Sequence, residues 1–251
     1  MTVGLICAIP EELTHLRKVL QGVSSTGAGR TEFYEGLLDG APVVLAGAGM
    51  GKVNAAIVST VLAEKFECSA VVFSGVAGGL DPALNIGDVV IADHIVQHDS
   101  GRIEDKRLVR YQPGHVSFIN PTEQLGYTTD LDLLCRVRAR LNEVALPSIP
   151  RAAGGNDRPP RITYGTILTG DQYVHCEATR QYLHRKFAAS AVEMEGGAVA
   201  QVCESYGIPW LVIRALSDLA GRESSMDFPL FVDKVASTSA TVVREVLPVF
   251  R

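Results

Sequence analysis

The sequence predicts an α/β protein: a single domain over residues 1–251 with three layers, α/β/α, around a twisted central sheet that is mixed but mainly parallel. Apolar residues make up 47% of the chain, which is enough for one continuous core. Several predicted strands are apolar throughout, as is typical of strands buried on both faces. Helical patterns separate these strands along the chain, as in layered α/β folds.

The predicted sheet begins at the N-terminus. Residues 3–8 (Val-Gly-Leu-Ile-Cys-Ala) form a first strand, and leucines recur at helical spacing over residues 11–20. Residues 31–38 and 42–46 flank Asp39-Gly40, a dipeptide that predicts a β-hairpin between them.

A helix and two strands follow the hairpin. We expect the helix over residues 52–66, a strand over 70–73 that breaks into the glycine-rich loop 75–79, and a strand over 88–96. The apolar pattern of the helix directs six residues toward the core: Val53, Ala56, Ile57, Thr60, Val61 and Leu62.

The middle of the chain is less regular. Residues 97–130 are rich in Gly, Pro, His and charge, which indicates a long functional loop. A helix is expected over 131–144. Residues near 145–160 hold four prolines and predict a surface insertion, because strand-like residues resume at 162–168.

The last part of the chain returns to strong patterns. We expect helices over 177–187 and 194–206 and an apolar strand over 210–213. Asp227 is the predicted N-cap of a final helix. That helix carries one apolar stripe: Phe228, Phe231, Val232, Val235, Val242, Val243 and Val246.

Composition excludes several classes of protein. The net charge of −5 argues against nucleic acid or an anionic membrane as a partner, since both need a basic face. No stretch approaches the ~18 apolar residues of a membrane span. Residues 1–10 lack the basic start and cleavage site of a signal peptide. The five cysteines are scattered and odd in number, which favours reduced thiols and a cytoplasmic location.

Acidic residues stand where apolar strands end. Glu12 follows the first strand, Glu193 and Glu195 precede a helix, and Ser217-Asp218 follows the strand that starts at residue 210. A buried charge is costly unless it is paired or used, which points to an enzyme acting on a sugar-like bond. Ligands bind beyond the carboxyl ends of parallel strands. We therefore expect Glu12, residues 75–79 and Ser217-Asp218 to converge. A simple stabilising charge in a helix's first turn remains open for Glu12.

Three other motifs have simpler explanations. Residues 46–53 (Ala-Gly-Ala-Gly-Met-Gly-Lys-Val) match neither a P-loop nor a dinucleotide fingerprint, so they form either a site wall or a plain tight turn. His98-Asp99 has no further ligand at a metal-binding spacing, which favours loop hydrogen bonds over metal. His175 and Cys176 are adjacent on an extended segment and point to opposite faces, so they form no nucleophile pair. No metal is expected.

Six segments carry a family resemblance. They are, in order, 8–12 (Ala-Ile-Pro-Glu-Glu), 49–55 (Gly-Met-Gly-Lys-Val-Asn-Ala), 75–79 (Gly-Val-Ala-Gly-Gly), 169–171 (Thr-Gly-Asp), 192–195 (Val-Glu-Met-Glu) and 214–218 (Arg-Ala-Leu-Ser-Asp). Together they resemble the 5′-methylthioadenosine/S-adenosylhomocysteine nucleosidases of the purine nucleoside phosphorylase superfamily. The resemblance spans nearly the whole chain except the insertion and parts of 97–130. It implies a nucleoside phosphorylase-like fold, and hydrolysis of the adenine–ribose bond without a cofactor.

The resemblance also implies roles for the acids. Glu12 resembles the acid that orients and deprotonates the attacking water, and Glu195 the one that grips the ribose hydroxyls, with Met194 beneath the sugar. Asp218, positioned by Ser217, resembles the acid that protonates adenine N7. We expect burial to raise the pKa of Asp218, and we expect Glu195 to remain ionised at a helix N-terminus.

The remaining site residues follow from the same resemblance. Tyr173 stands where the family stacks an aromatic ring on the base, and Val174 where backbone atoms meet the base edge. Ile9 and Met50 would line the pocket for the 5′-thio group. The other implied substrate-binding residues are Val76, where many relatives carry Ser or Thr, together with Ala77, Gly78, Glu193 and Arg214.

Rival functions remain on the same scaffold. Related phosphorylases bind phosphate with an arginine just after the strand equivalent to 70–73, where this chain has Ser74. A non-catalytic sensor would be expected to lack one of the three acids. An aminofutalosine-type nucleosidase differs only in the 5′ group of its substrate. The resemblance further implies a homodimer in which the partner's loop closes the 5′ pocket, with residues 97–130 as the candidate loop.

Overall fold

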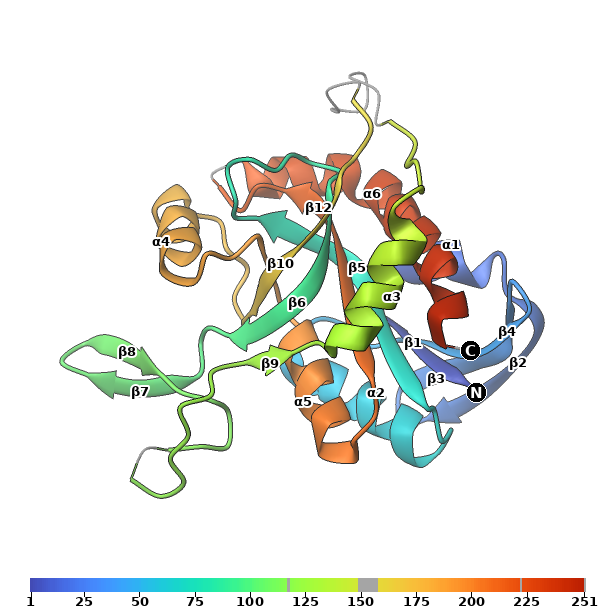
Figure 1. Ribbon diagram of the computed structural model, residues 1–251, viewed down its shortest axis with the longest axis horizontal. Coiled ribbons are helices and arrows are strands. Elements are labelled where there is room, and N and C mark those ends of the chain that lie inside the picture. The colour runs from blue at the N-terminus through green and yellow to red at the C-terminus, as the bar shows by residue number, and fades with distance from the viewer. Residues whose placement is uncertain (117, 149–157, 222, 251) are drawn as a thin grey trace.

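The computed structural model describes residues 1–116, 118–148, 158–221 and 223–250 (Figure 1). Residues 149–157, the greater part of the predicted insertion near 145–160, lie outside these ranges. No helix in the described ranges has both the length and the apolar character that a bilayer span requires.

The helices and strands alternate along much of the chain. The strands are β1 (Val3–Cys7), β2 (Gln21–Ala28), β3 (Thr31–Leu38), β4 (Ala41–Gly47), β5 (Ala70–Gly79), β6 (Val89–Gln97), β7 (Gly101–Glu104), β8 (Arg107–Arg110), β9 (Tyr127–Thr128), β10 (Ile162–Thr169), β11 (Ala191–Glu193) and β12 (Trp210–Asp218). The helices are α1 (Pro10–Arg17), α2 (Lys52–Glu64), α3 (Leu131–Leu141), α4 (Glu177–Phe187), α5 (Gly196–Tyr206), α6 (Ser224–Val246) and the short 3₁₀ helix η2 (Leu247–Phe250).

Strand β5 organises the main sheet because it pairs with three other strands. It runs parallel to β1 and β12, and its last residues pair antiparallel with β11. Since β11 also pairs with β10, the strands β5, β12, β6, β10 and β11 close into a ring, from which β1, β4, β3 and β2 extend as an open arm. The α/β class and the mixed sheet are confirmed. The closure was not predicted, because β11 is three residues long and its sequence does not specify a partner.

Parallel pairings are fewer than the sequence led us to expect. Antiparallel pairings join β12 to β6, β11 to β5 and the strands of the β2–β3–β4 arm. Strand β2 was not predicted at all. Its residues are largely exposed and lack apolar alternation, and its backbone pairing with β3 places it in the sheet.

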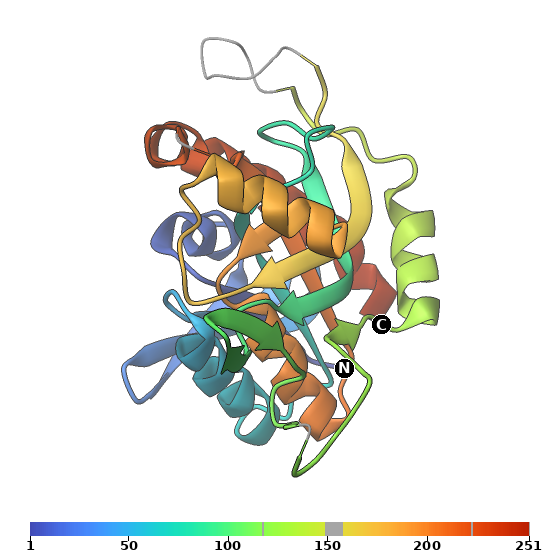
Figure 2. The ribbon, with the colours of Figure 1, turned by 90° about the vertical axis from the view of Figure 1, so that its left-hand side faces the viewer.

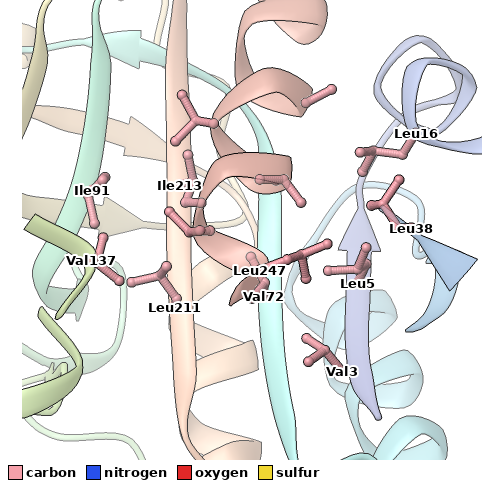
Figure 3. Packing of buried hydrophobic residues seen from close by; sticks show 14 of the residues in the cluster. Val3, Leu5, Leu16, Leu38, Val72, Ile91, Val137, Leu211, Ile213 and Leu247 are labelled. Carbon is pink, nitrogen blue, oxygen red and sulfur yellow. The ribbon is translucent and has the colours of Figure 1, made fainter. Parts of the chain in front are cut away.

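Helices cover both sides of this sheet. Residues of α1, α3 and α6 form one apolar cluster with β1, β5 and β12, and Figure 3 shows part of it around Leu5, Val72 and Ile213. Residues of α2 and α5 form a second cluster on the opposite side. Figure 2 shows these two helices side by side. The two clusters pack against opposite sides of the same strands. This packing holds the strands in place, and the ends of these strands build the site.

Helix α2 exposes part of the face that was predicted to be inward. Leu62 is buried as expected, together with Ala55, Val58 and Ser59. Val53 and Ile57, however, are 71% and 55% exposed. The helix is apolar nearly all round, so periodicity alone could not choose the inward face.

Several element boundaries also differ from the prediction. Strands β5 and β12 continue to Gly79 and Asp218, so the expected glycine-rich loop 75–79 is strand. Residues 97–130 contain the β7–β8 hairpin and β9 rather than loop alone. Asp227 lies inside the first turn of α6, whose N-cap is Glu223.

Candidate active site

A cavity that opens to solvent lies where β1, β5, β11 and β12 end. The cavity is lined by Ala8, Ile9, Glu12, Met50, Val76, Ala77, Gly78, Gln172, Tyr173, Val174, Val192, Glu193, Met194, Glu195, Ser217, Asp218 and Phe228. The expected convergence of Glu12, residues 75–79 and Ser217-Asp218 is therefore confirmed. Every predicted site residue lines the cavity except Arg214, which is fully buried behind it.

Glu12 is held in the first turn of α1 by three backbone groups. Its Oε2 accepts hydrogen bonds from the N–H groups of Ala8 (2.6 Å) and Ile9 (3.1 Å). Its Oε1 accepts one from the N–H of Val76 at 2.9 Å. Burial raises the pKa of Glu12, against the lowering effect of Arg214 and of these hydrogen bonds. The side chain is 3% exposed. Because it accepts the N–H of the N-cap Ile9, it also stabilises the first turn of α1, as the simpler explanation expected.

A glycine makes this arrangement possible. A Cβ at Gly75 would lie 2.5 Å from Glu12 Oε1 and 2.7 Å from Arg214 Nη1. Such distances are far shorter than van der Waals contact, so any side chain here would displace both groups. The glycine run of β5 lets the acid and the guanidinium lie directly against the strand.

Arg214 is the buried cation next to the carboxylates of Glu12, Glu193 and Glu195. Its Nη2 lies 2.6 Å from Glu193 Oε2 and 3.6 Å from Glu195 Oε2, and its guanidinium stacks 3.7 Å from the ring centre of Phe73. Burial alone would lower the pKa of Arg214, but Glu193, Glu195 and Glu12 together raise it. One permanent cation therefore serves three buried carboxylates.

The carboxylate of Glu193 accepts hydrogen bonds from other groups of the chain. Its Oε2 accepts the backbone N–H groups of Glu195 (3.1 Å) and Gly196 (2.7 Å), and its Oε1 accepts the hydroxyl of Thr169. It thus caps the start of α5 and holds Arg214. Although Glu193 lines the cavity, these bonds leave little of its carboxylate for the substrate contact that the resemblance implied.

Glu195 has fewer partners than Glu193. Its Oε1 accepts the N–H of Gly51 at 2.8 Å, and its side chain makes no cap hydrogen bond to α5. Burial and the neighbouring charge of Glu193 raise the pKa of Glu195 to about 7. The expectation that the helix N-terminus keeps Glu195 ionised does not fit this geometry, because Glu193 accepts those N–H groups instead.

Asp218 lies at the other end of the cavity. Its Oδ1 accepts the N–H of Ala220 at 2.8 Å, and its Oδ2 accepts the hydroxyl of Ser217 at 3.1 Å. Burial raises the pKa of Asp218, which confirms the expected direction. Tyr173 and Val174 line the cavity as well.

The other sequence motifs also find their places. The loop that contains Met50 and Gly51 is a wall of the site, which decides between the two open explanations. Asp99 pairs with Lys52 (Nζ–Oδ1 2.7 Å), and no group of three potential metal ligands occurs among the described residues. His175 Nδ1 lies 2.9 Å from Ser224 Oγ. His98 and His175 do not line the cavity.

Four lining residues were missed by the sequence reasoning: Ala8, Gln172, Val192 and Phe228. The first three adjoin predicted site residues, and adjacency was the available signal. Phe228 was assigned to the apolar stripe of the last helix. It is half-buried because the first turn of α6 reaches over the cavity while the rest of the stripe packs on the sheet.

Comparisons with known proteins place the chain in a family. The model of the phosphorylase superfamily matches residues 2–248. A 5′-methylthioadenosine/S-adenosylhomocysteine nucleosidase of Mycobacterium bovis is 58% identical, over 99% of this chain and 98% of the relative. The chain belongs to this nucleosidase family. The recognised resemblance is confirmed.

Solved structures of the nucleosidase family and its neighbours share the fold. A nucleosidase of this name from Colwellia psychrerythraea, solved in complex with adenine, has a TM-score of 0.83 and 30% identity, over 99% of this chain and 95% of that one. A futalosine hydrolase of Helicobacter pylori has a TM-score of 0.83 and 30% identity, over 99% and 97% of the two chains. The nucleoside phosphorylase-like fold is thereby confirmed.

Proposed function

We propose that this nucleosidase hydrolyses the N-glycosidic bond of 5′-methylthioadenosine and S-adenosylhomocysteine, releasing adenine and the 5′-thio-ribose. Its 58% identical relative carries this name, and a solved relative binds adenine. The cavity offers three separate carboxylates for the three tasks of such a reaction: stabilising the sugar cation, activating water and protonating the base. We call the region of Glu12, Glu193, Glu195 and Arg214 the sugar end, and that of Tyr173, Val174, Ser217 and Asp218 the base end.

The sugar end would stabilise the transition state. N-glycosidic cleavage passes through an oxocarbenium-like sugar, and a fixed carboxylate close to it lowers the energy of the developing positive charge. Glu195 would grip the ribose hydroxyls, with Met194 beneath the ring. Its other oxygen lies 3.6 Å from Arg214 Nη2 and has no hydrogen bond from the described residues, which leaves it available for a hydroxyl.

Glu12 would orient and deprotonate the attacking water. Three backbone N–H groups fix its carboxylate, and burial raises its pKa, which makes it a stronger base than an exposed glutamate. Val76 lines the cavity with an alkyl side chain and no hydroxyl, so a water here would depend on Glu12 for its orientation.

Asp218 would protonate adenine N7. Adenine leaves poorly as an anion, so an acid must deliver a proton as the bond breaks. The raised pKa of Asp218 favours the protonated form that this step requires, and the Ser217 hydroxyl fixes its orientation. Tyr173 would stack on the base, and the backbone of Val174, Ala77 and Gly78 would meet its edge. Ile9 and Met50 would face the 5′-thio group.

One observation carries the choice of hydrolysis over phosphorolysis. Within the described chain, no lysine, arginine or histidine lines the cavity. A phosphate dianion would meet Glu12, and the N–H of Val76 is already bound to that carboxylate. The position of the phosphate-binding arginine holds Ser74, whose hydroxyl lies 2.8 Å from that of Ser239. The cavity therefore favours water over phosphate as the nucleophile.

An aminofutalosine-type substrate is the second candidate. It is favoured by the likeness to a futalosine hydrolase of Helicobacter pylori, whose TM-score and identity equal those of the solved nucleosidase from Colwellia psychrerythraea. The substrates differ at the 5′ end, where the lining includes Ile9 and Met50.

Three wider expectations belong to this proposal. A single domain over residues 1–251 agrees with a family match over 2–248. A homodimer is supported by the exposed Val53 and Ile57 of α2 and by the β7–β8 hairpin, which projects from the body in Figure 1. A cytoplasmic location agrees with the buried thiols of Cys7, Cys68 and Cys203.

The test is adenine release from 5′-methylthioadenosine with and without phosphate. We expect equal turnover in both and free 5-methylthioribose as the second product. Turnover that requires phosphate and yields the sugar 1-phosphate would contradict hydrolysis. Binding without turnover of any adenine nucleoside would instead identify a non-catalytic sensor. Competition with aminofutalosine would rank the 5′ groups.

A further inference from the structure

Three charged residues outside the cavity join two of its walls. We call Lys52, Asp99 and Asp171 the Lys52 cluster. Lys52 Nζ lies 2.7 Å from Asp99 Oδ1 and 3.7 Å from Asp171 Oδ2. Asp99 Oδ2 accepts the backbone N–H of Asp171 at 2.9 Å. The three residues come from the start of α2, the segment after β6 and the segment after β10, and none of them lines the cavity.

The cluster also fixes the start of α2. Gly51 is the N-cap and has no side chain to bind the first N–H groups of the helix. Asp171 Oδ1 replaces it by accepting the backbone N–H of Lys52 at 2.8 Å. Gly51 itself has φ +97°, a conformation that other residues rarely adopt. The loop before α2 is thus held in one conformation by a carboxylate from another segment.

This loop touches the proposed catalytic machinery. The N–H of Gly51 donates to Glu195 Oε1 at 2.8 Å, and the preceding Met50 lines the cavity. On the other side, Gln172, Tyr173 and Val174 directly follow Asp171 and also line the cavity. The Lys52 cluster therefore lies between the wall that carries Met50 and the wall that carries Tyr173.

We propose that Lys52, Asp99 and Asp171 are positioning residues that hold the Gly51 N–H on Glu195 and set the spacing between these two walls. The cluster acts through Gly51 and Tyr173 and does not touch the substrate. This inference rests on the proposed role of Glu195 in gripping ribose.

The charges around Glu195 make the consequence measurable. Glu193 on β11 and Glu12 on α1 raise the pKa of Glu195, while Arg214 on β12 and the Gly51 N–H lower it. Loss of the Gly51 hydrogen bond would remove one of two stabilising partners of the carboxylate. The pKa of Glu195 would then rise above about 7.

The charged neighbours of the cluster do not replace Lys52. Burial alone would raise the pKa of Asp99, but its hydrogen bonds to Lys52 and the Asp171 N–H lower it, so the carboxylate is ionised. Burial lowers the pKa of His98, which leaves its imidazole neutral near pH 7. Arg110 is committed to the carbonyl of His98 and to Tyr182. Lys52 is therefore the cation that Asp99 depends on.

The test compares Lys52→Met with Arg244→Met, which removes a basic partner from the exposed Asp39 pair (2.7 Å) far from the cavity. For Lys52→Met we expect kcat/KM for 5′-methylthioadenosine to fall by about tenfold or more, since small misplacements in a site cost this much. We also expect the acid limb of its pH profile to move to higher pH. Asp99→Asn should do the same, and the double variant should lose no more than either single one. Arg244→Met should match the wild type.

A second measurement does not depend on turnover. Amide hydrogen exchange in Lys52→Met should accelerate in residues 48–54 and 171–175 and remain unchanged in α6. Unchanged exchange in both segments, an unmoved acid limb, or multiplicative losses in the double variant would overturn the proposal. If the wild type turned over no adenine nucleoside, the proposed function would fail. The exchange result alone would then decide whether the cluster holds the two walls.

Discussion

The carboxylates at the two ends of the cavity have different kinds of partner. At the sugar end, Glu12, Glu193 and Glu195 surround the guanidinium of Arg214, which lies 2.6 Å from Glu193 and 3.6 Å from Glu195. At the base end, Asp218 accepts hydrogen bonds from a hydroxyl and a backbone N–H. No ion pair formed by the described residues includes Asp218, and its electrostatic neighbours are Asp227 and the more weakly acting His175.

This difference separates two kinds of chemistry within one cavity. Burial raises the pKa of the acids at both ends. At the sugar end Arg214 opposes this effect, which favours negative charge where positive charge develops during cleavage. No such cation pairs with Asp218 among the described residues, so burial there favours the protonated carboxyl, which can deliver a proton.

The largest effect is expected at the base end. Asp218→Asn should lower kcat for adenine release by about 10³-fold or more, because it removes the proton donor. Binding of a non-hydrolysable nucleoside analogue, measured by calorimetry, should suffer less than in Glu195→Ala. Asp132→Asn is the matched control, since Asp132 is exposed on α3 and does not line the cavity. Unchanged turnover in Asp218→Asn would refute the assigned acid role.

The next effect is on stability at the sugar end. Arg214→Met should lower the free energy of unfolding by about 3–5 kcal/mol, because it leaves buried carboxylates without their cation. Arg140→Met, which breaks an exposed pair with Glu245, should cost less than about 1 kcal/mol. Urea unfolding at pH 8 measures both. A loss in Arg214→Met as small as in the control would show that the acids do not depend on Arg214.

The sequence predicted the residues of the cavity better than their roles. Strand ends and glycines brought Glu12, Val76 and Asp218 together, because the carboxyl ends of neighbouring strands meet in any sheet of this kind. The division between Glu193 and Glu195 could not be predicted. It depends on which carboxylate turns toward the N–H groups of α5, and two glutamates separated by one residue give no signal for that choice.

The fold was predicted to a similar depth. Apolar strands such as β6 and β10 and the hairpin of β3 and β4 follow from local pattern. Strand β2, the closure through β11 and the exposed face of α2 do not. Strand β2 and the closure depend on backbone pairing, which the side-chain pattern does not indicate. The exposed face of α2 depends on which side of an apolar helix packs on the sheet.

A smaller effect concerns the pH dependence of catalysis. With the pKa of Glu195 raised to about 7, kcat/KM should fall as pH decreases below that value, by about tenfold per pH unit, because only the ionised carboxylate stabilises the sugar cation. Glu195→Gln should give a low activity without this acid limb. An acid limb that persists in Glu195→Gln would assign it to another group.

The smallest effect is the pH dependence of stability. The pKa of Glu195 is higher in the folded protein than in the unfolded chain, so the folded state binds more protons between about pH 4.5 and 7. The free energy of unfolding should therefore fall as pH rises through this window. Glu195→Gln should reduce this fall and stabilise the empty protein at pH 8 by about 1 kcal/mol. A larger fall in the variant than in the wild type would contradict the predicted contribution of Glu195.

The separation of the two ends is tested most directly with a leaving group that needs no proton. p-Nitrophenolate leaves as an anion, so p-nitrophenyl 5-methylthio-β-D-ribofuranoside requires the sugar end but not Asp218. We expect Asp218→Asn to hydrolyse it within about tenfold of the wild-type rate, while Glu12→Gln loses activity on this substrate and on 5′-methylthioadenosine. An Asp218→Asn variant that is slowed equally on both substrates would contradict the assignment of water and sugar to one end and the base to the other.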